Sequence, residues 1–127
     1  MKVDGGLGMG FSPNIGEIAS EAKSQEDRGY DGIWTAETSH DPFLPLAIAA
    51  EHTEKLEIGT AIAVAFARNP MVLANIGWDL QALSQGRFNL GLGSQIKPHI
   101  TKRFSICLLY TSPSPRDATL SRMPSSA

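Results

Sequence analysis

The sequence has 127 residues, of which 42% are hydrophobic, and a formal net charge of −2 at neutral pH. This composition suits a globular core and excludes a wholly disordered chain. The small net charge gives no electrostatic reason to expect nucleic acid or a membrane surface as a partner. The single cysteine, Cys107, excludes a disulfide framework and a cysteine-based metal site, and we expect no bound metal.

No membrane segment or secretion signal is expected. The longest apolar run, residues 44–50, is too short to span a bilayer. Residues 1–4 lack the apolar region of a signal peptide. A cytoplasmic location is therefore the expectation.

One pattern repeats along residues 2–92: a short apolar strand, a loop and an amphipathic helix. Strands are expected at about residues 2–6, 31–36, 56–64 and 87–92. Helices are expected at about residues 14–29, 42–55 and 70–84. Asn14 and Asn69 are of the residue type that caps helix starts, and Gly29 and Gly86 are typical of helix ends.

Apolar periodicity indicates which helix residues should face a sheet. They are Ile15, Ile18, Ala19 and Ala22 in the first helix, Leu44 and Ile48 in the second, and Val72, Leu73, Ile76, Leu80 and Leu83 in the third. Trp34 and Trp78 are also assigned to the core, because large aromatic side chains supply much of the buried area in a small domain.

Strands that alternate with helices at this spacing predict parallel βαβ units with right-handed crossovers. Four such units make only half of a (β/α)₈ barrel, which needs about 250 residues. The predicted fold class is therefore α/β, namely the N-terminal half of a (β/α)₈ barrel, truncated after about four βα units. Residues 1–105 are assigned to this partial barrel.

From residue 106 onward serine and proline dominate and no apolar period continues. Residues 106–127 are expected to be disordered. They are interpreted as non-native sequence derived from an adaptor or vector and are excluded from the fold. The alternative is a native disordered tail.

In parallel α/β folds, functional residues gather at the carboxyl ends of the strands. The glycine-rich residues 5–10 invite a dinucleotide-binding interpretation, with Glu37 as the ribose-binding acid of a Rossmann fold. However, Phe11 stands where the third glycine of that fingerprint belongs. A flavodoxin-like phosphate loop would be rich in hydroxyl groups, whereas residues 5–13 contain only Ser12.

Residues 37–41 read Glu-Thr-Ser-His-Asp and follow the second strand. Glu37 and His40 are the candidate catalytic residues, because a hydride transfer to a carbonyl or imine requires a matching proton. A purely structural role is the alternative for both. For Asp41 the structural role is preferred, as the cap of the helix that follows.

Three motifs carry a family resemblance. Residues 68–70 read Arg-Asn-Pro, residues 84–88 read Ser-Gln-Gly-Arg-Phe, and residues 90–94 read Leu-Gly-Leu-Gly-Ser. In this order and at this separation they resemble the luciferase-like monooxygenase superfamily over residues 1–105. The opening residues and residues 93–100 resemble its branch that uses coenzyme F420.

The resemblance implies a site at the barrel mouth for an isoalloxazine-type ring. It places a cis peptide bond between Ala61 and Ile62 beneath the ring, Thr38 at the ring's polar edge, and Ser94 and Gln95 along the ring. Some relatives carry Asp-His where this chain has Glu-Thr, which leaves the proton donor open between Glu37 and His40.

The function that the resemblance implies is an F420-dependent oxidoreductase, which transfers a hydride between reduced deazaflavin and a small organic substrate. An FMN-dependent monooxygenase of the same superfamily is the first alternative. A non-enzymatic binding module, as a half-barrel, flavodoxin-like or Rossmann domain, is the second. The parent protein is expected to be a homodimer. This chain alone is expected to be inactive and to aggregate or pair with another half, because a half-barrel leaves sheet edges uncovered.

Overall fold

The computed structural model describes residues 1–8 and 14–104, and the segment expected to be non-native, residues 106–127, lies outside the described residues. The main sheet has four strands: β1 (Asp4–Gly6), β2 (Gly32–Thr35), β3 (Glu57–Thr60) and β5 (Phe88–Asn89). Their order in the sheet is β1-β2-β3-β5, and every neighbouring pair is parallel. The predicted parallel α/β fold is therefore confirmed.

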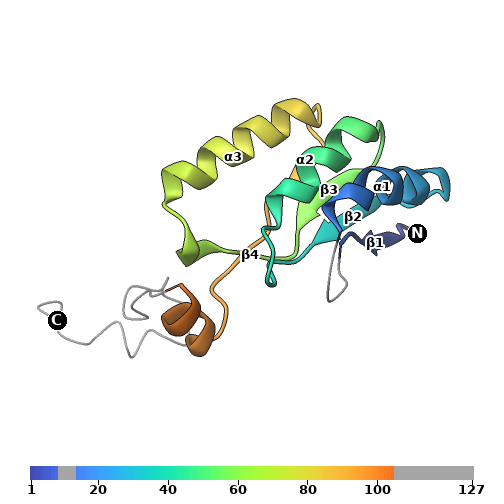
Figure 1. Ribbon diagram of the computed structural model, residues 1–127. Helices are drawn as coiled ribbons and strands as arrows, with labels where there is room; N and C mark the ends of the chain where they lie inside the picture. The colour runs from blue at the N-terminus through green and yellow to red at the C-terminus, as the bar shows by residue number, and fades with distance from the viewer. Residues whose placement is uncertain (9–13, 105–127) are drawn as a thin grey trace, which may run out of the picture.

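The described residues form three α-helices, α1 (Ile18–Asp27), α2 (Phe43–His52) and α3 (Pro70–Leu83), and the short 3₁₀ helix η1 (Ile15–Glu17) precedes α1. Figure 1 shows α1, α2 and α3 on the same face of the sheet. A doubly wound sheet reverses its strand order and places helices on both faces. Here the fourth strand in the sheet pairs with the third and the order never reverses. The described part of the chain is therefore the wall of a barrel rather than a Rossmann or flavodoxin-like sheet.

Two of the strands are interrupted at their carboxyl ends. After β3 the strand direction resumes as β4 (Ala63–Val64), and after β5 it resumes as β6 (Leu92–Gly93). These two short strands pair with each other in parallel. The sequence had predicted one continuous strand in each place. The 3₁₀ helix η2 (Ala65–Ala67) follows β4, and the π-helix η3 (His99–Arg103) follows β6.

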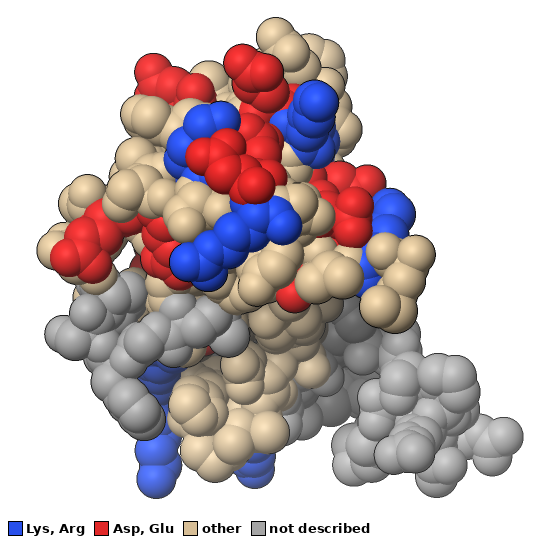
Figure 2. Space-filling model, turned by 90° about the vertical axis from the view of Figure 1, so that its right-hand side faces the viewer, with Lys and Arg blue, Asp and Glu red and all other residues tan. Residues whose placement is uncertain are grey.

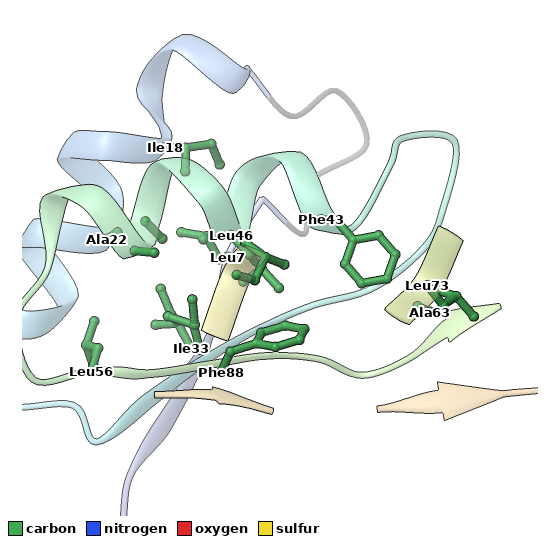
Figure 3. Packing of buried hydrophobic residues seen from close by; sticks show 14 residues of the cluster. Leu7, Ile18, Ala22, Ile33, Phe43, Leu46, Leu56, Ala63, Leu73 and Phe88 are labelled. Atoms are coloured by element: carbon green, nitrogen blue, oxygen red, sulfur yellow. The ribbon is translucent and has the colours of Figure 1, made fainter. Parts of the chain in front are cut away.

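The hydrophobic core lies between the sheet and the three helices (Figure 3). Ile33 and Ile58 project into it from the centre of the sheet, and Leu46 projects into it from α2. Each is completely shielded from solvent, and burying a side chain of this size contributes about 1.5–3 kcal/mol. Because this core includes residues of all three α-helices, it holds each of them against the sheet.

The helix faces differ in part from the predicted ones. Leu44 is 58% exposed, whereas Leu46, Ala49 and Ala50 of the same helix are buried. Helix α2 is apolar on nearly all sides, so its sequence period does not reveal which side is covered. The core assignment of Trp78 is wrong: its side chain is 79% exposed on the side of α3 away from Leu73 and Leu80. No helix within residues 1–8 and 14–104 is both long and apolar enough to cross a membrane.

Arg87 joins α2 to the start of β3. Its guanidinium donates hydrogen bonds to the carbonyl oxygens of Ala50, Thr53, Leu56 and Ser84, at 2.7–3.1 Å, and to the Thr53 hydroxyl. The last carbonyls of a helix have no partner within the helix, so an arginine that binds them stabilises the helix end. The arginine of the Ser-Gln-Gly-Arg-Phe motif is therefore a structural residue.

Charged residues surround the amino ends of the strands, where acidic and basic side chains alternate on the surface (Figure 2). Several of them pair, for example Lys2 with Glu57 at 3.4 Å and Lys23 with Asp27 at 3.2 Å. Glu26 is different, because one of its carboxylate oxygens accepts hydrogen bonds from three consecutive backbone N–H groups, those of residues 54–56, at 2.8–3.1 Å.

The environment of Glu26 makes stability depend on pH. Burial acts to raise the pKa of this carboxyl, but the hydrogen bonds from Lys55, Glu54 and Leu56, with that from Lys23, outweigh it and hold the pKa below its ordinary value of 4.5. A carboxyl whose pKa is lowered by folding contributes stability that is complete above its unfolded pKa. That contribution disappears as the pH falls through the folded pKa.

We expect Glu26→Gln to lower the free energy of unfolding at pH 7 by about 1.5–3 kcal/mol, the usual worth of hydrogen bonds to a charged group. The difference from the wild type should shrink as the pH falls below about 4.5, because the wild-type carboxyl is then protonated as well. Denaturant unfolding of the full chain at pH 7, 5 and 3.5 measures this. Glu51→Gln, at an exposed position of α2, is the matched control. A difference that stays constant over this pH range would contradict the assignment.

Candidate functional site

The loops that follow β2 and β3 meet at the carboxyl ends of the strands, and Glu37 joins them. The backbone N–H of Glu37 donates to the carbonyl oxygen of Ile62 at 3.1 Å. In return, the N–H of Val64 donates to the Glu37 carboxylate at 2.6 Å. The Glu37 side chain is only 5% exposed. Its backbone and its side chain together hold the segment that follows β3.

Arg68 binds the same carboxylate. Its two terminal nitrogens donate to the two oxygens of Glu37 at 2.9 and 3.0 Å, and one of them also donates to Asp41 at 3.1 Å. The guanidinium lies over the Phe43 ring, with 5.0 Å from its central carbon to the ring centroid. The hydrogen bond to Glu37, opposed by burial and supported by Asp41, raises the pKa of Arg68. The cluster therefore contains a permanent cation between two carboxylates.

Asp41 has a second function at the start of α2. Its other carboxylate oxygen accepts hydrogen bonds from the N–H groups of Phe43 and Leu44 at 2.7 and 2.8 Å. The Asp41 side chain therefore caps this helix as expected, but Pro42 rather than Asp41 occupies the position directly before its first residue. The loop 37–41 is thus fixed at both ends, and residues 38–40 between them are exposed.

The interruption after β3 is bridged by a side chain. The hydroxyl of Thr60 donates to the carbonyl oxygen of Gly91 at 2.7 Å and accepts from the N–H of Gly91 at 2.9 Å. Beyond it, the N–H of Ala63 donates to the same carbonyl at 2.9 Å. The peptide bond between Ala61 and Ile62 is cis, as the resemblance implied.

Two glycines allow the neighbouring strand to approach this segment. A Cβ atom at Gly91 would overlap the backbone carbonyl of Thr60, and one at Gly93 would overlap the side chain of Ile62. Gly93 pairs with Val64, so the residues after Gly93 emerge beside the end of β4. The Leu-Gly-Leu-Gly part of the motif therefore serves close backbone packing at the mouth of the barrel wall.

The structure places the expected site residues in two groups. The first group is joined by the backbone hydrogen bonds and strand pairing described above, and it contains Glu37, Ile62 and the segment that leads to Ser94. The second group is wholly or partly exposed to solvent. Thr38 and His40 are exposed on the loop, and the His40 ring has no hydrogen bond to another described residue. Ala61 and Ser94 are exposed, and Gln95 is half-buried with a φ of 64°.

Sequence reasoning missed Arg68 and its partnership with Glu37 and Asp41. It interpreted Arg-Asn-Pro only as the start of α3, a role that Asn69 does fulfil by accepting from the N–H of Met71 at 2.8 Å. One signal was available. Two carboxylates at the ends of a short loop need a cation if they are buried, and Arg68 is the only arginine between residues 29 and 86.

The exposed side chains at these carboxyl ends are small or polar. Ala61 offers a small apolar contact, and Thr38 and Ser94 offer hydroxyl groups that donate or accept. Arg68 does not offer a free charge for a phosphate group, because two carboxylates already surround it. Among the described residues no group of three or more His, Cys, Asp or Glu side chains could hold a metal ion.

Residues 2–124 match the family described as luciferase-like monooxygenase. The chain belongs to this family. It is 61% identical over 107 residues to the uncharacterized protein Rv1360 of Mycobacterium tuberculosis, a match that covers 84% of this chain and 30% of Rv1360. It is 35% identical over 94 residues to Rv3520c of the same organism, a putative coenzyme F420-dependent oxidoreductase. This match covers 69% of this chain and 26% of Rv3520c.

A solved structure confirms the fold. The oxygenating constituent of 3,6-diketocamphane monooxygenase from Pseudomonas putida, in complex with FMN, superimposes with a TM-score of 0.74 at 19% identity. The superposition covers 88% of this chain and 34% of that protein. The chain therefore spans about a third or less of the length of these relatives. Its described residues form the first part of their (β/α)₈ barrel.

We expect Gly91→Ala to lower the free energy of unfolding by about 1–3 kcal/mol, because the new methyl group meets the backbone of Thr60, which cannot move aside as a side chain could. Gly77→Ala, in α3, is the matched control. Its methyl group would meet only the edge of Phe88 at 4.0 Å, and alanine favours a helix over glycine by about 0.5–1 kcal/mol. Denaturant unfolding of both variants measures the difference. Equal effects would contradict the close approach at Gly91.

Proposed function

We propose that this chain is the first part of an F420-dependent oxidoreductase, which transfers a hydride between the reduced deazaflavin and a small organic substrate. The observation that carries the proposal is the surface at the carboxyl ends of β2, β3 and β6, where Thr38, Ala61 and Ser94 are exposed around a segment held by Glu37. The relative named as a putative F420-dependent oxidoreductase supports the choice of coenzyme.

In this proposal Thr38, Ala61, Ile62, Ser94 and Gln95 hold the ring of the coenzyme. When bound, the coenzyme supplies the hydride-transfer chemistry. The protein's contribution is to orient the ring, to exclude water and to supply or remove the accompanying proton.

Two residues are candidates for the proton transfer, and their environments differ. Both oxygens of Glu37 already accept hydrogen bonds from Arg68, and one also accepts from Val64. His40 is exposed, and an imidazole can donate or accept a proton near neutral pH. We therefore assign the proton transfer to His40 rather than to Glu37.

The FMN-dependent monooxygenase is the second candidate, and the structural similarity to the FMN complex favours it.

The full protein is further proposed to be a homodimer, since Leu44, Met71 and Trp78 on α2 and α3 leave exposed apolar surface that a second copy could cover. The boundary at residue 105 and the non-native origin of residues 106–127 also remain proposals. Recovering the reading frame from the source DNA beyond codon 105 tests them directly.

The experiment uses a hybrid, in which residues 1–104 are joined to the part of Rv1360 that follows the position aligned with residue 104. We expect the folded hybrid to bind F420 at least tenfold more tightly than FMN, a difference of about 1.4 kcal/mol. Titration followed by the absorbance or fluorescence of each coenzyme measures this. Tighter binding of FMN would select the second candidate, and a folded hybrid that binds neither would refute both.

His40→Gln should lower the turnover of the hybrid by about 100-fold or more, the usual contribution of a general acid or base, with little change in coenzyme affinity. His52→Gln is the matched control, since that ring is exposed on α2 and lies outside the proposed site, with its Nδ1 2.9 Å from the carbonyl oxygen of Ile48. Turnover that is equal in the two variants would show that His40 does not transfer the proton.

A further inference from the structure

The two ends of the loop 37–41 bind the same guanidinium. Glu37, at the first position, forms a two-point ion pair with Arg68, and Asp41, at the last position, binds one of the same nitrogens. The three residues between them are exposed. We propose that Arg68 is a positioning residue, which holds the loop so that Thr38 and His40 are presented at a fixed place beside the carboxyl end of β3.

The arrangement depends on the shape of arginine. A guanidinium is planar and offers several donors in one plane, so it can bind two carboxylates at once. A lysine offers one nitrogen and cannot reproduce the two parallel bonds to Glu37 together with the bond to Asp41. The Arg68 side chain is 15% exposed and that of Glu37 is 5% exposed, so solvent and salt screen this pair weakly.

Arg68 also connects the loop to its surroundings. Its Nη1 atom, which donates to one oxygen of Glu37, lies 3.4 Å from the carbonyl oxygen of Val64, whose own N–H donates to the same oxygen. The guanidinium covers the ring of Phe43, the first residue of α2. The start of α2 and the segment after β3 therefore meet at one side chain, and the exposed residues of the loop are fixed from both sides.

The chain contains a matched comparison at the opposite end of the sheet. Arg87 also joins a helix to a strand through several hydrogen bonds, but it binds carbonyl groups around the end of α2 and the start of β3. Replacing either arginine by lysine should destabilise the fold. Only the replacement of Arg68 should loosen the loop 37–41.

The test is hydrogen exchange of individual amides in the full chain, compared among the wild type, Arg68→Lys and Arg87→Lys. The informative amides are those of Glu37, Phe43, Leu44 and Val64, all of which donate hydrogen bonds within this cluster. In Arg68→Lys their exchange should accelerate at least tenfold more than that of amides in α1. In Arg87→Lys the same amides should change no more than those of α1.

Acceleration in Arg68→Lys that is uniform across the sheet and helices would overturn the proposal, because it would show a purely global effect. Unchanged exchange at the four amides would overturn it as well. If Arg68→Lys fails to fold, Asp41→Asn replaces it, since an asparagine oxygen can still cap α2 while the charged bond to Arg68 is lost. The Glu37 amide should then exchange faster than in the wild type while those of Phe43 and Leu44 remain protected, and loss of protection at all three equally would refute the proposal.

The significance of the loop for catalysis rests on the proposed function, but the exchange measurement does not, because it is made without coenzyme. Coenzyme titration of the hybrid carrying Arg68→Lys joins the two proposals. A tenfold weaker affinity for F420 in Arg68→Lys, with no change of affinity in Arg87→Lys, would support the proposal that Thr38 must be held in place to bind the coenzyme. Localised acceleration of exchange with unaltered affinity would leave the positioning role of Arg68 established and would remove Thr38 from that site.

Discussion

The carboxylate of Glu37 is the interaction on which the carboxyl end of this sheet depends. It binds the N–H of Val64 beyond the interruption of the third strand and pairs with Arg68 just before α3. A strand that leaves its ladder exposes unpaired backbone groups, and these must find other partners if they are buried. Glu37 provides one such partner and the hydroxyl of Thr60 provides another. Without them the interruption would not be compatible with a buried sheet.

The two ends of the sheet use charged side chains for different purposes. At the amino end, Glu26 binds consecutive N–H groups and Arg87 binds carbonyl groups, so both satisfy backbone atoms in the turns and stabilise the fold. At the carboxyl end, Glu37, Asp41 and Arg68 bind mainly one another and hold a loop whose centre faces solvent. This separation follows the usual pattern of parallel α/β proteins, in which one end is devoted to stability and the other to function.

The sequence predicted those features of the fold that depend on residues close together in the chain. Asn14 and Asn69 were assigned as helix caps, and each accepts a hydrogen bond from an N–H two residues ahead. The alternation of strands with helices along the chain predicted the parallel sheet. The interruption after Thr60 was not predictable from periodicity, because it depends on the hydroxyl of one strand meeting the backbone of Gly91 on another. The partnership of Arg68 with Glu37 likewise joins residues 31 positions apart, which no local period encodes.

Over the described residues, the α-helices cover only one face of the sheet, and this gives the two tryptophans contrasting environments. Alternation along β2 places Trp34 on the face opposite the helices, where its indole N–H donates to the carboxylate of Asp4 at 3.1 Å. Trp78 extends from the outer side of α3. The indole emission of Trp34 will therefore move to shorter wavelength whenever other strands enclose that inner face, whereas closure of the barrel leaves the outer surface around Trp78 unchanged. Trp34 is therefore an intrinsic fluorescent reporter of barrel closure.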